Sequence, residues 1–160
     1  MSDTDLPPAI PAATVILLRD APGGLETLML HRTSAVAFGG MWVFPGGRVD
    51  DGDRRAGDAD DEDAARRAAA REAAEECGLH IATSELVAFS HWTPPIETPR
   101  RYATWFFVAR ATEGDVLVDG GEIRDHAWLP PGEVLERRER GEVDLAPPTY
   151  VTLADLAAHD

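Results

Sequence analysis

Three glutamates share the run at positions 71–79, with a spacing that brings them to one face of a helix. Glu72, Glu75 and Glu76 stand at i, i+3 and i+4, and at about 100° per residue their side chains fall within a narrow arc. Carboxylates this close repel each other unless a cation neutralises them, and their oxygens suit a hard divalent ion. The pattern therefore predicts a metal site, with a solvated acidic helix face as the alternative.

The end of this helix strengthens the metal-site interpretation. Gly78 directly follows the acidic residues and is typical of a helix that stops in a left-handed conformation. The glutamates would then lie in the last turn, where the negative end of the helix dipole disfavours anions. Glutamates kept at this unfavourable end of the helix indicate a functional role.

A glycine-rich turn at Gly46 and Gly47 precedes this helix. Together the two features resemble the signature of the Nudix hydrolases. In that signature a glycine is followed after five residues by Glu, and after seven more by the run Arg-Glu-aliphatic-x-Glu-Glu-x-Gly-aliphatic. The second half matches positions 71–79 closely, with Ala73 and Leu79 at the aliphatic positions.

The first half departs from the signature in length and in residue type. Counting forward from Gly47 puts the acidic position at Asp53, whereas counting back from Arg71 puts it at Asp63, so ten residues are inserted. Both residues are Asp instead of Glu. We expect Asp63 to be the partner of Arg71, because spacing within a helix is the stricter geometric constraint.

The resemblance implies a magnesium-dependent hydrolase, with manganese as an alternative ion, that cleaves the diphosphate linkage of a nucleoside diphosphate derivative. The metal ligands that it implies are oxygens of Gly46, Glu72, Glu75 and Glu76. The residues that it implies as support for the motif are Gly47, Asp63 and Gly78. Arg71 cannot coordinate a cation and is expected to hold Asp63 or a glutamate by a bidentate contact; an ordinary surface ion pair is the alternative.

The general base is less well defined by the sequence. In the families that this chain resembles, the base is one of the helix glutamates, here Glu75, or a glutamate on a loop before a strand tryptophan. Glu122 lies six residues before Trp128 and fits the second description. A fourth metal ligand and an exposed loop glutamate are the alternatives for Glu122.

Two further segments, 41–47 and 91–102, resemble the Nudix subgroup of the peroxisomal coenzyme A diphosphatases. This resemblance makes coenzyme A or acyl-coenzyme A the first substrate, with ADP-ribose or nucleotide sugars next. The residues expected to bind substrate are Arg100, Arg101 and Tyr102. Ala103 and Trp105 stand where the subgroup has an acidic and a basic residue. A binding or regulatory protein with the Nudix fold and little catalytic activity is the alternative from another functional class.

Composition narrows the classes of function. The 160 residues carry a net charge of -14 and the basic residues are all arginine, which argues against binding nucleic acid through a basic face. Without lysine there is no Walker A loop and no Schiff base. Cys77 is the single cysteine, so no disulfide framework is expected. No apolar run approaches the length of a membrane-spanning segment, so a cytoplasmic location is the default expectation. The sequence leaves the oligomeric state open, with a homodimer among the options.

The elements that must position these residues alternate between strands and helices. Apolar runs predict strands at 13–19 and 27–32, joined as a hairpin, and at 42–44, 85–93, 101–110 and 123–129. Helices are predicted from residue 60 or 61 to Cys77, over 131–140, and from 147 onward. We expect a tail over 1–12, one domain over 13–160 with an inserted loop near 54–60, and a mixed sheet flanked by helices, which fits the α/β/α sandwich of the Nudix fold.

Overall fold

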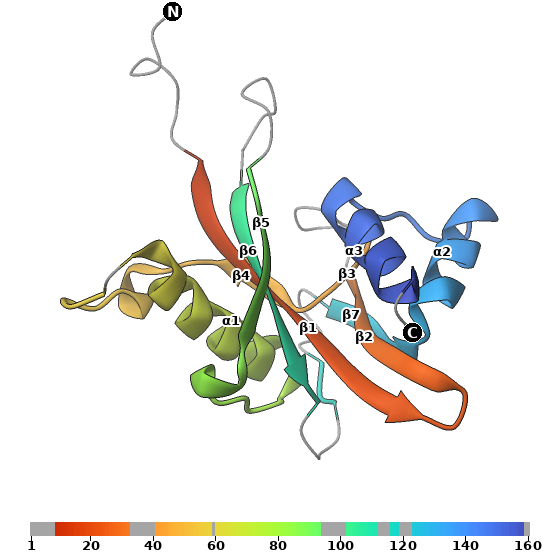
Figure 1. Cartoon of the computed structure of the whole chain (residues 1–160), viewed down its shortest axis with the longest axis horizontal. Coiled ribbons are helices and arrows are strands. Elements are labelled where there is room, and N and C mark those ends of the chain that lie inside the picture. The colour runs from red at the N-terminus through yellow and green to blue at the C-terminus, as the bar shows by residue number, and fades with distance from the viewer. Residues whose placement is uncertain are drawn as a thin grey trace, which may run out of the picture.

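The computed structural model describes residues 9–32, 41–58, 60–93, 102–111, 116–118 and 123–158. The strands and helices follow one another largely in the order that the sequence predicts (Figure 1). The elements in chain order are β1 (Ile10–Ala21), β2 (Gly24–Arg32), β3 (Trp42–Val43), β4 (Gly46–Arg48), the 3₁₀ turn η2 (Asp51–Asp53), α1 (Asp61–Cys77), the 3₁₀ turn η3 (Thr83–Glu85), β5 (Val87–Trp92), β6 (Tyr102–Arg110), β7 (Ile123–Leu129), α2 (Pro131–Glu139) and α3 (Pro147–Ala158).

The strands form one mixed sheet of seven, in the order β3-β2-β1-β6-β5, with β4 paired to β1 and β7 paired to β2. β1 and β6 run parallel, with Val15 opposite Phe107. The predicted hairpin is confirmed, since β1 and β2 are antiparallel up to the pair Ala21 and Gly24. Gly24 has a φ of 121°, a conformation that glycine adopts without strain.

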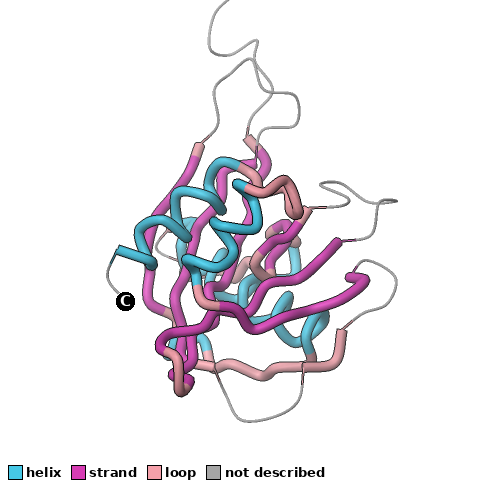
Figure 2. Tube along the Cα trace, turned by 90° about the vertical axis from the view of Figure 1, so that its right-hand side faces the viewer, coloured by secondary structure: helices cyan, strands magenta, loops and turns pink. Residues whose placement is uncertain are grey.

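The two faces of the sheet carry separate apolar cores because strand residues alternate between them. Val15 and Leu17 of β1 belong to the cluster that includes the α1 alanines, whereas Ile16 belongs to the cluster with Val134 of α2 and Leu153 of α3. Figure 1 shows α1 on one side of the strands and α2 with α3 on the other, and Figure 2 looks from the α2 and α3 side. The predicted α/β/α sandwich is confirmed.

Helix α1 begins and ends where its capping residues require. The Asp60 side chain accepts a hydrogen bond from the N–H of Glu62, and Gly78 ends the helix with a φ of 70°. The face that packs on the sheet is made of alanines, which permit a close approach to the strands. Buried alanines of α1 are Ala64, Ala65, Ala68, Ala69 and Ala73. The opposite face is free to carry charge.

Several predicted boundaries differ from the structure, and two of the differences involve pairing with β1. Residues 46–48 form β4 instead of only a turn, because Gly46 pairs with Thr14 and Arg48 with Ala12 of β1. β1 also begins at Ile10, opposite Tyr102 of β6, so the strand takes in the last three residues of the predicted tail. Both differences arise because strands distant in the sequence pair with the first part of β1, β4 over 12–14 and β6 over 10–18.

Cys77 lies at the end of α1 with its side chain buried. Burial raises the pKa of its thiol to about 12, since the charged thiolate is poorly solvated there. The thiol is therefore protonated at neutral pH and packs as a small apolar group. Within the described ranges, no helix is both long enough and apolar enough to cross a bilayer.

Candidate functional site

The glycine pair of β4 brings its backbone against both β1 and α1. A Cβ atom on Gly46 would lie 2.5 Å from the Ala13 carbonyl oxygen, and one on Gly47 would lie 2.5 Å from Oε1 of Glu72. Neither glycine is among the described glycines with positive φ. These positions therefore need glycine for lack of space. The missing side chains let carboxylates of α1 come into contact with the backbone of β4.

Replacing Gly46 is expected to destabilise the fold. The added Cβ of Gly46→Ala would meet backbone atoms of Ala13 and Thr14, which move only with the sheet. We expect the free energy of unfolding to fall by about 1–3 kcal/mol, measured by urea denaturation. Gly52→Ala is the control, because nothing lies within 4 Å of its added Cβ; an equal loss in the control would contradict this account.

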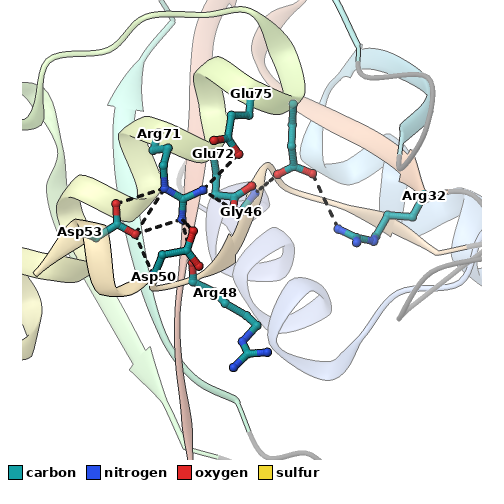
Figure 3. A network of polar contacts seen from close by, with 9 residues as sticks. Arg32, Gly46, Arg48, Asp50, Asp53, Arg71, Glu72 and Glu75 are labelled. Carbon is teal, nitrogen blue, oxygen red and sulfur yellow. Dashed lines mark hydrogen bonds and ion pairs between the residues drawn. The ribbon is translucent and has the colours of Figure 1, made fainter.

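Arg71 joins the helix to the turn that precedes it (Figure 3). Its Nε lies 3.1 Å from Asp53 Oδ1 and its Nη2 lies 3.0 Å from Asp53 Oδ2, a bidentate pair. Nη2 also donates to the Arg48 carbonyl at 3.0 Å and lies 3.3 Å from Asp50 Oδ2. The hydrogen bonds with Asp53, a buried residue, raise the pKa of Arg71 above its already high value. Arg71 is therefore a permanent cation at this position.

The partner that we expected for Arg71 was Asp63, and this expectation is wrong. Asp53 takes that role, as counting forward from Gly47 indicates. Asp63 lies eight residues before Arg71 on the same helix, a rise of about 12 Å, whereas Asp53 lies on η2. The ten extra residues therefore lie between Asp53 and Arg71. The chain passes through η2 before the insertion, and this path keeps Asp53 beside Arg71.

The second amino group of Arg71 gathers two of the predicted metal ligands. Nη1 lies 3.0 Å from Glu72 Oε1 and 3.1 Å from Glu75 Oε2. Oxygens from two carboxylates thus converge on one nitrogen position, which confirms that Glu72 and Glu75 share a face of α1. The positive charge at that position offsets their mutual repulsion.

Glu76 points from the same helix toward the glycine turn. It is only 2% exposed, and its Oε1 accepts a hydrogen bond from the Gly46 N–H at 2.8 Å. Its Oε2 lies 3.7 Å from Nη1 of Arg32, the last residue of β2. Sequence analysis did not identify Arg32 as a site residue; the available signal was a basic residue where a buried strand ends.

Comparison with known proteins decides the family. The model of the NUDIX domain matches residues 8–149. This chain belongs to the Nudix family. Nudix hydrolases act on pyrophosphate bonds, and the chain is a hydrolase of that class.

Solved Nudix structures share the whole fold at low sequence identity. A NUDIX hydrolase from Alicyclobacillus acidocaldarius is 24% identical, with a TM-score of 0.83 over 94% of this chain and 92% of that one. The NUDIX domain of Shewanella oneidensis NrtR complexed with ADP ribose is 18% identical, with a TM-score of 0.70 over 99% and 92%. A C. elegans Ap4A hydrolase is 18% identical, with a TM-score of 0.65 over 94% and 97%. No curated protein matches the chain.

Nudix hydrolases generally use divalent metal ions. Across the described part of the chain, no three His, Cys, Asp or Glu side chains are grouped as a metal site. The residues nevertheless fit a hard cation in their chemistry. Glu72 and Glu75 present carboxylate oxygens on one face of α1, beside Arg71 Nη1. The Glu72 carboxylate also lies against the backbone of Gly47, and carboxylate and backbone oxygens are the ligands that such a cation takes.

The predicted substrate-binding residues and the predicted base Glu122 are placed only in part by the structure. Arg100, Arg101 and Glu122 fall outside the described ranges. Tyr102 opens β6 opposite Ile10, whereas Gly46 pairs with Thr14 of the same strand. Four residues of strand separate these two levels, or about 13 Å. The role of Tyr102 in substrate binding therefore stays a prediction.

Aromatic residues near β6 pack as part of the Nudix core. Trp105 lies 4.6 Å from His91 and 6.2 Å from Phe107, measured between ring centroids. A cavity of about 130 Å³ beside Trp105 and Arg54 is small compared with ligand sites of roughly 300–1,000 Å³. This cavity is too small to hold a complete nucleotide.

Proposed function

We propose that the chain is a Mg²⁺-dependent Nudix hydrolase that cleaves the diphosphate linkage of a nucleoside diphosphate derivative. The observation that carries the proposal is that Glu72 Oε1 and Glu75 Oε2 lie 3.0 and 3.1 Å from the same nitrogen, Arg71 Nη1, so both carboxylates lie on one face of α1. Arg71 is itself fixed by Asp53 and the Arg48 carbonyl. The carboxylates are thus held on a rigid helix by a partner that cannot lose its charge.

The charges of this chain explain why a metal is needed. A diphosphate resists water because the nucleophile must approach phosphorus through anionic oxygens, and a protein of net charge -14 adds to that repulsion. A divalent ion would screen the phosphates and lower the pKa of a bound water. Oxygens of Glu72, Glu75, Glu76 and Gly46 would hold it. Manganese, which accepts the same oxygen ligands, is the alternative ion.

Within this site the residues have different duties. Glu72 and Glu75 are the groups placed to meet the cation directly, since both already face one cationic nitrogen. Glu76 is positioned by the Gly46 N–H. This hydrogen bond ties a third carboxylate to the glycine pair of β4. Arg71 positions the carboxylates and does not itself coordinate the metal.

The substrate class follows from the family and is the least constrained part of the proposal. Structural neighbours include a NUDIX domain complexed with ADP ribose and an Ap4A hydrolase, and both ligands carry an adenosine joined to further phosphate. Coenzyme A also contains an adenosine diphosphate unit, and the sequence resemblance keeps it in the class. We propose a small nucleotide of this kind, with coenzyme A, ADP-ribose and nucleotide sugars as the members to separate.

A substrate screen with purified protein tests the proposal. Coenzyme A, acetyl-coenzyme A, ADP-ribose, a nucleotide sugar, Ap4A and nucleoside triphosphates are each incubated with Mg²⁺, with Mn²⁺ and with a chelator. We expect cleavage of at least one adenosine diphosphate derivative that the chelator abolishes. Binding of ADP-ribose by calorimetry without turnover of any compound would instead favour a Nudix-fold binding protein.

Glu122 is our proposed general base, on its position six residues before Trp128. Glu122→Gln is expected to lower turnover by about a hundredfold or more, because proton transfer by a positioned side chain contributes that much. Turnover is measured at saturating metal on the best substrate of the screen. A loss below about tenfold would remove Glu122 from this role and leave Glu75 as the base.

A further inference from the structure

Arg67 lies one helical turn before Arg71 on α1 and reaches the loop that the signature does not have. Its Nε donates to the Asp53 carbonyl oxygen at 2.7 Å. Its Nη2 lies 2.5 Å from both carboxylate oxygens of Asp58, within the inserted residues. One side chain therefore binds both the start of the insertion and its middle.

Asp53 is consequently held from several directions. Its carboxylate binds Arg71 and also accepts a hydrogen bond from the Asp50 N–H at 2.8 Å, while its own N–H donates to the Asp50 carbonyl at 2.9 Å. The Asp53 carbonyl binds Arg67. The Asp53 side chain thus positions Arg71, and the Asp53 backbone is held by Arg67.

The length of the insertion makes such a contact useful. Seventeen residues separate Asp53 from Arg71, where the signature has seven, so the covalent path alone restrains the pair less. Asp58 also accepts a hydrogen bond from the Arg55 N–H at 3.0 Å, which closes a turn within the loop. Arg67 binds this turn, so the inserted loop is tied to the second turn of α1 in addition to its covalent connection at Asp61.

The Arg67 pair differs from a second ion pair of the same loop. Arg67 and Asp58 side chains are 22% and 18% exposed, whereas Arg54 and Asp61 are 43% and 79% exposed at a distance of 3.4 Å. Exposed pairs of the second kind contribute little to stability. The Arg54 side chain binds Asp61 at the start of α1, whereas Arg67 binds the Asp53 carbonyl, so Arg54 is a matched control.

We propose that Arg67, with Asp58, is a positioning residue that clamps the inserted loop and fixes Asp53 against Arg71. The clamp acts on the metal carboxylates through Arg71, so the inference rests on the proposed function. It assigns a task to the insertion of this chain, which replaces the short connection of the signature by a loop bound to the helix.

Two measurements on the full chain test the clamp. Hydrogen exchange reports the amides of Asp53 and Arg54, which donate within η2 to Asp50 and Asp51. Mn²⁺ affinity is read by electron paramagnetic resonance of the free ion. Arg67→Ala and Asp58→Asn are compared with Arg54→Ala, and Arg67→Ala is repeated in an Arg71→Ala background.

We expect Arg67→Ala and Asp58→Asn to lower the protection factors of both amides at least severalfold, whereas the protection factors, which correct for the intrinsic exchange rate of each sequence, stay unchanged in Arg54→Ala. Mn²⁺ affinity should fall about three- to tenfold in Arg67→Ala, less than the 10–100-fold typical of direct partners of metal ligands. That loss should vanish in the Arg71→Ala background, because the effect passes through Arg71. Unchanged exchange in both clamp variants, or an equal Mn²⁺ loss with and without Arg71, would overturn the proposal.

Failure of the proposed function gives a different result. A wild type that binds no Mn²⁺ would remove the metal site, while the exchange data would still decide whether Arg67 holds η2. Asp58→Asn lies outside the helix, so it keeps the test valid if Arg67→Ala does not fold.

Discussion

Glu75→Gln is expected to lower metal-dependent turnover by about a hundredfold or more, with little change in the free energy of unfolding. Glu75 is 56% exposed and accepts a hydrogen bond from Arg71, so a neutral isostere keeps its shape and removes only the charge. A cation held by carboxylates loses a ligand charge, and the groups that act on water lose their alignment. Steady-state kinetics over a Mg²⁺ titration measures the effect.

The control for Glu75→Gln is Glu62→Gln on the same helix. Glu62 also pairs with an arginine one turn away, Arg66, at 3.3 Å, but it lies in the first turn of α1, away from the glycine turn. We expect Glu62→Gln to retain full turnover. If Glu75→Gln kept more than about a tenth of the activity, the carboxylates would not form the metal site proposed here.

Gly47→Ala is expected to reduce turnover by about a hundredfold while the protein stays folded. The added Cβ would lie 2.5 Å from Glu72 Oε1 and 2.6 Å from its Cδ, so the carboxylate must move. Displacing a catalytic group by about 1 Å is enough for a loss of this size. Kinetics and thermal denaturation of the same preparation separate the two effects.

Two neighbouring glycines provide the comparison for Gly47→Ala. Gly46→Ala should mainly lower stability, because its Cβ meets backbone atoms, and Gly52→Ala should change neither property, because its Cβ meets open space. A Gly47→Ala variant with normal turnover would show that the position of Glu72 against the turn is not required. Mn²⁺ affinity should fall together with turnover, since the displaced group is a metal ligand in our proposal.

The stability of α1 is reduced where its function is concentrated. No basic residue lies in its last turn, while Glu72, Glu75 and Glu76 place negative charge near the negative end of the helix dipole. Arg71 supplies the compensating charge from within the helix, and Arg32 supplies another from β2. This arrangement is typical of a site kept for binding a cation.

Much of the scaffold was predictable from the sequence because it depends on neighbouring residues. Apolar runs bounded by a turn predicted β1, β2 and their hairpin, and the acidic start and Gly78 predicted the bounds of α1. The i, i+3, i+4 spacing predicted that Glu72 and Glu75 share a face, and both meet Arg71 Nη1. Each of these features follows from local periodicity and capping.

Only the tertiary structure decided which distant groups meet. The choice of Asp53 over Asp63 depends on the path of an inserted loop, and the contacts of Arg67 and Arg32 join elements whose separation along the chain has no periodicity. Pairing with β1 likewise made residues 46–48 a strand. The sequence by itself determined the family motif and its elements, because these are local; the partners of the motif residues required the fold, because long-range contacts are set by packing.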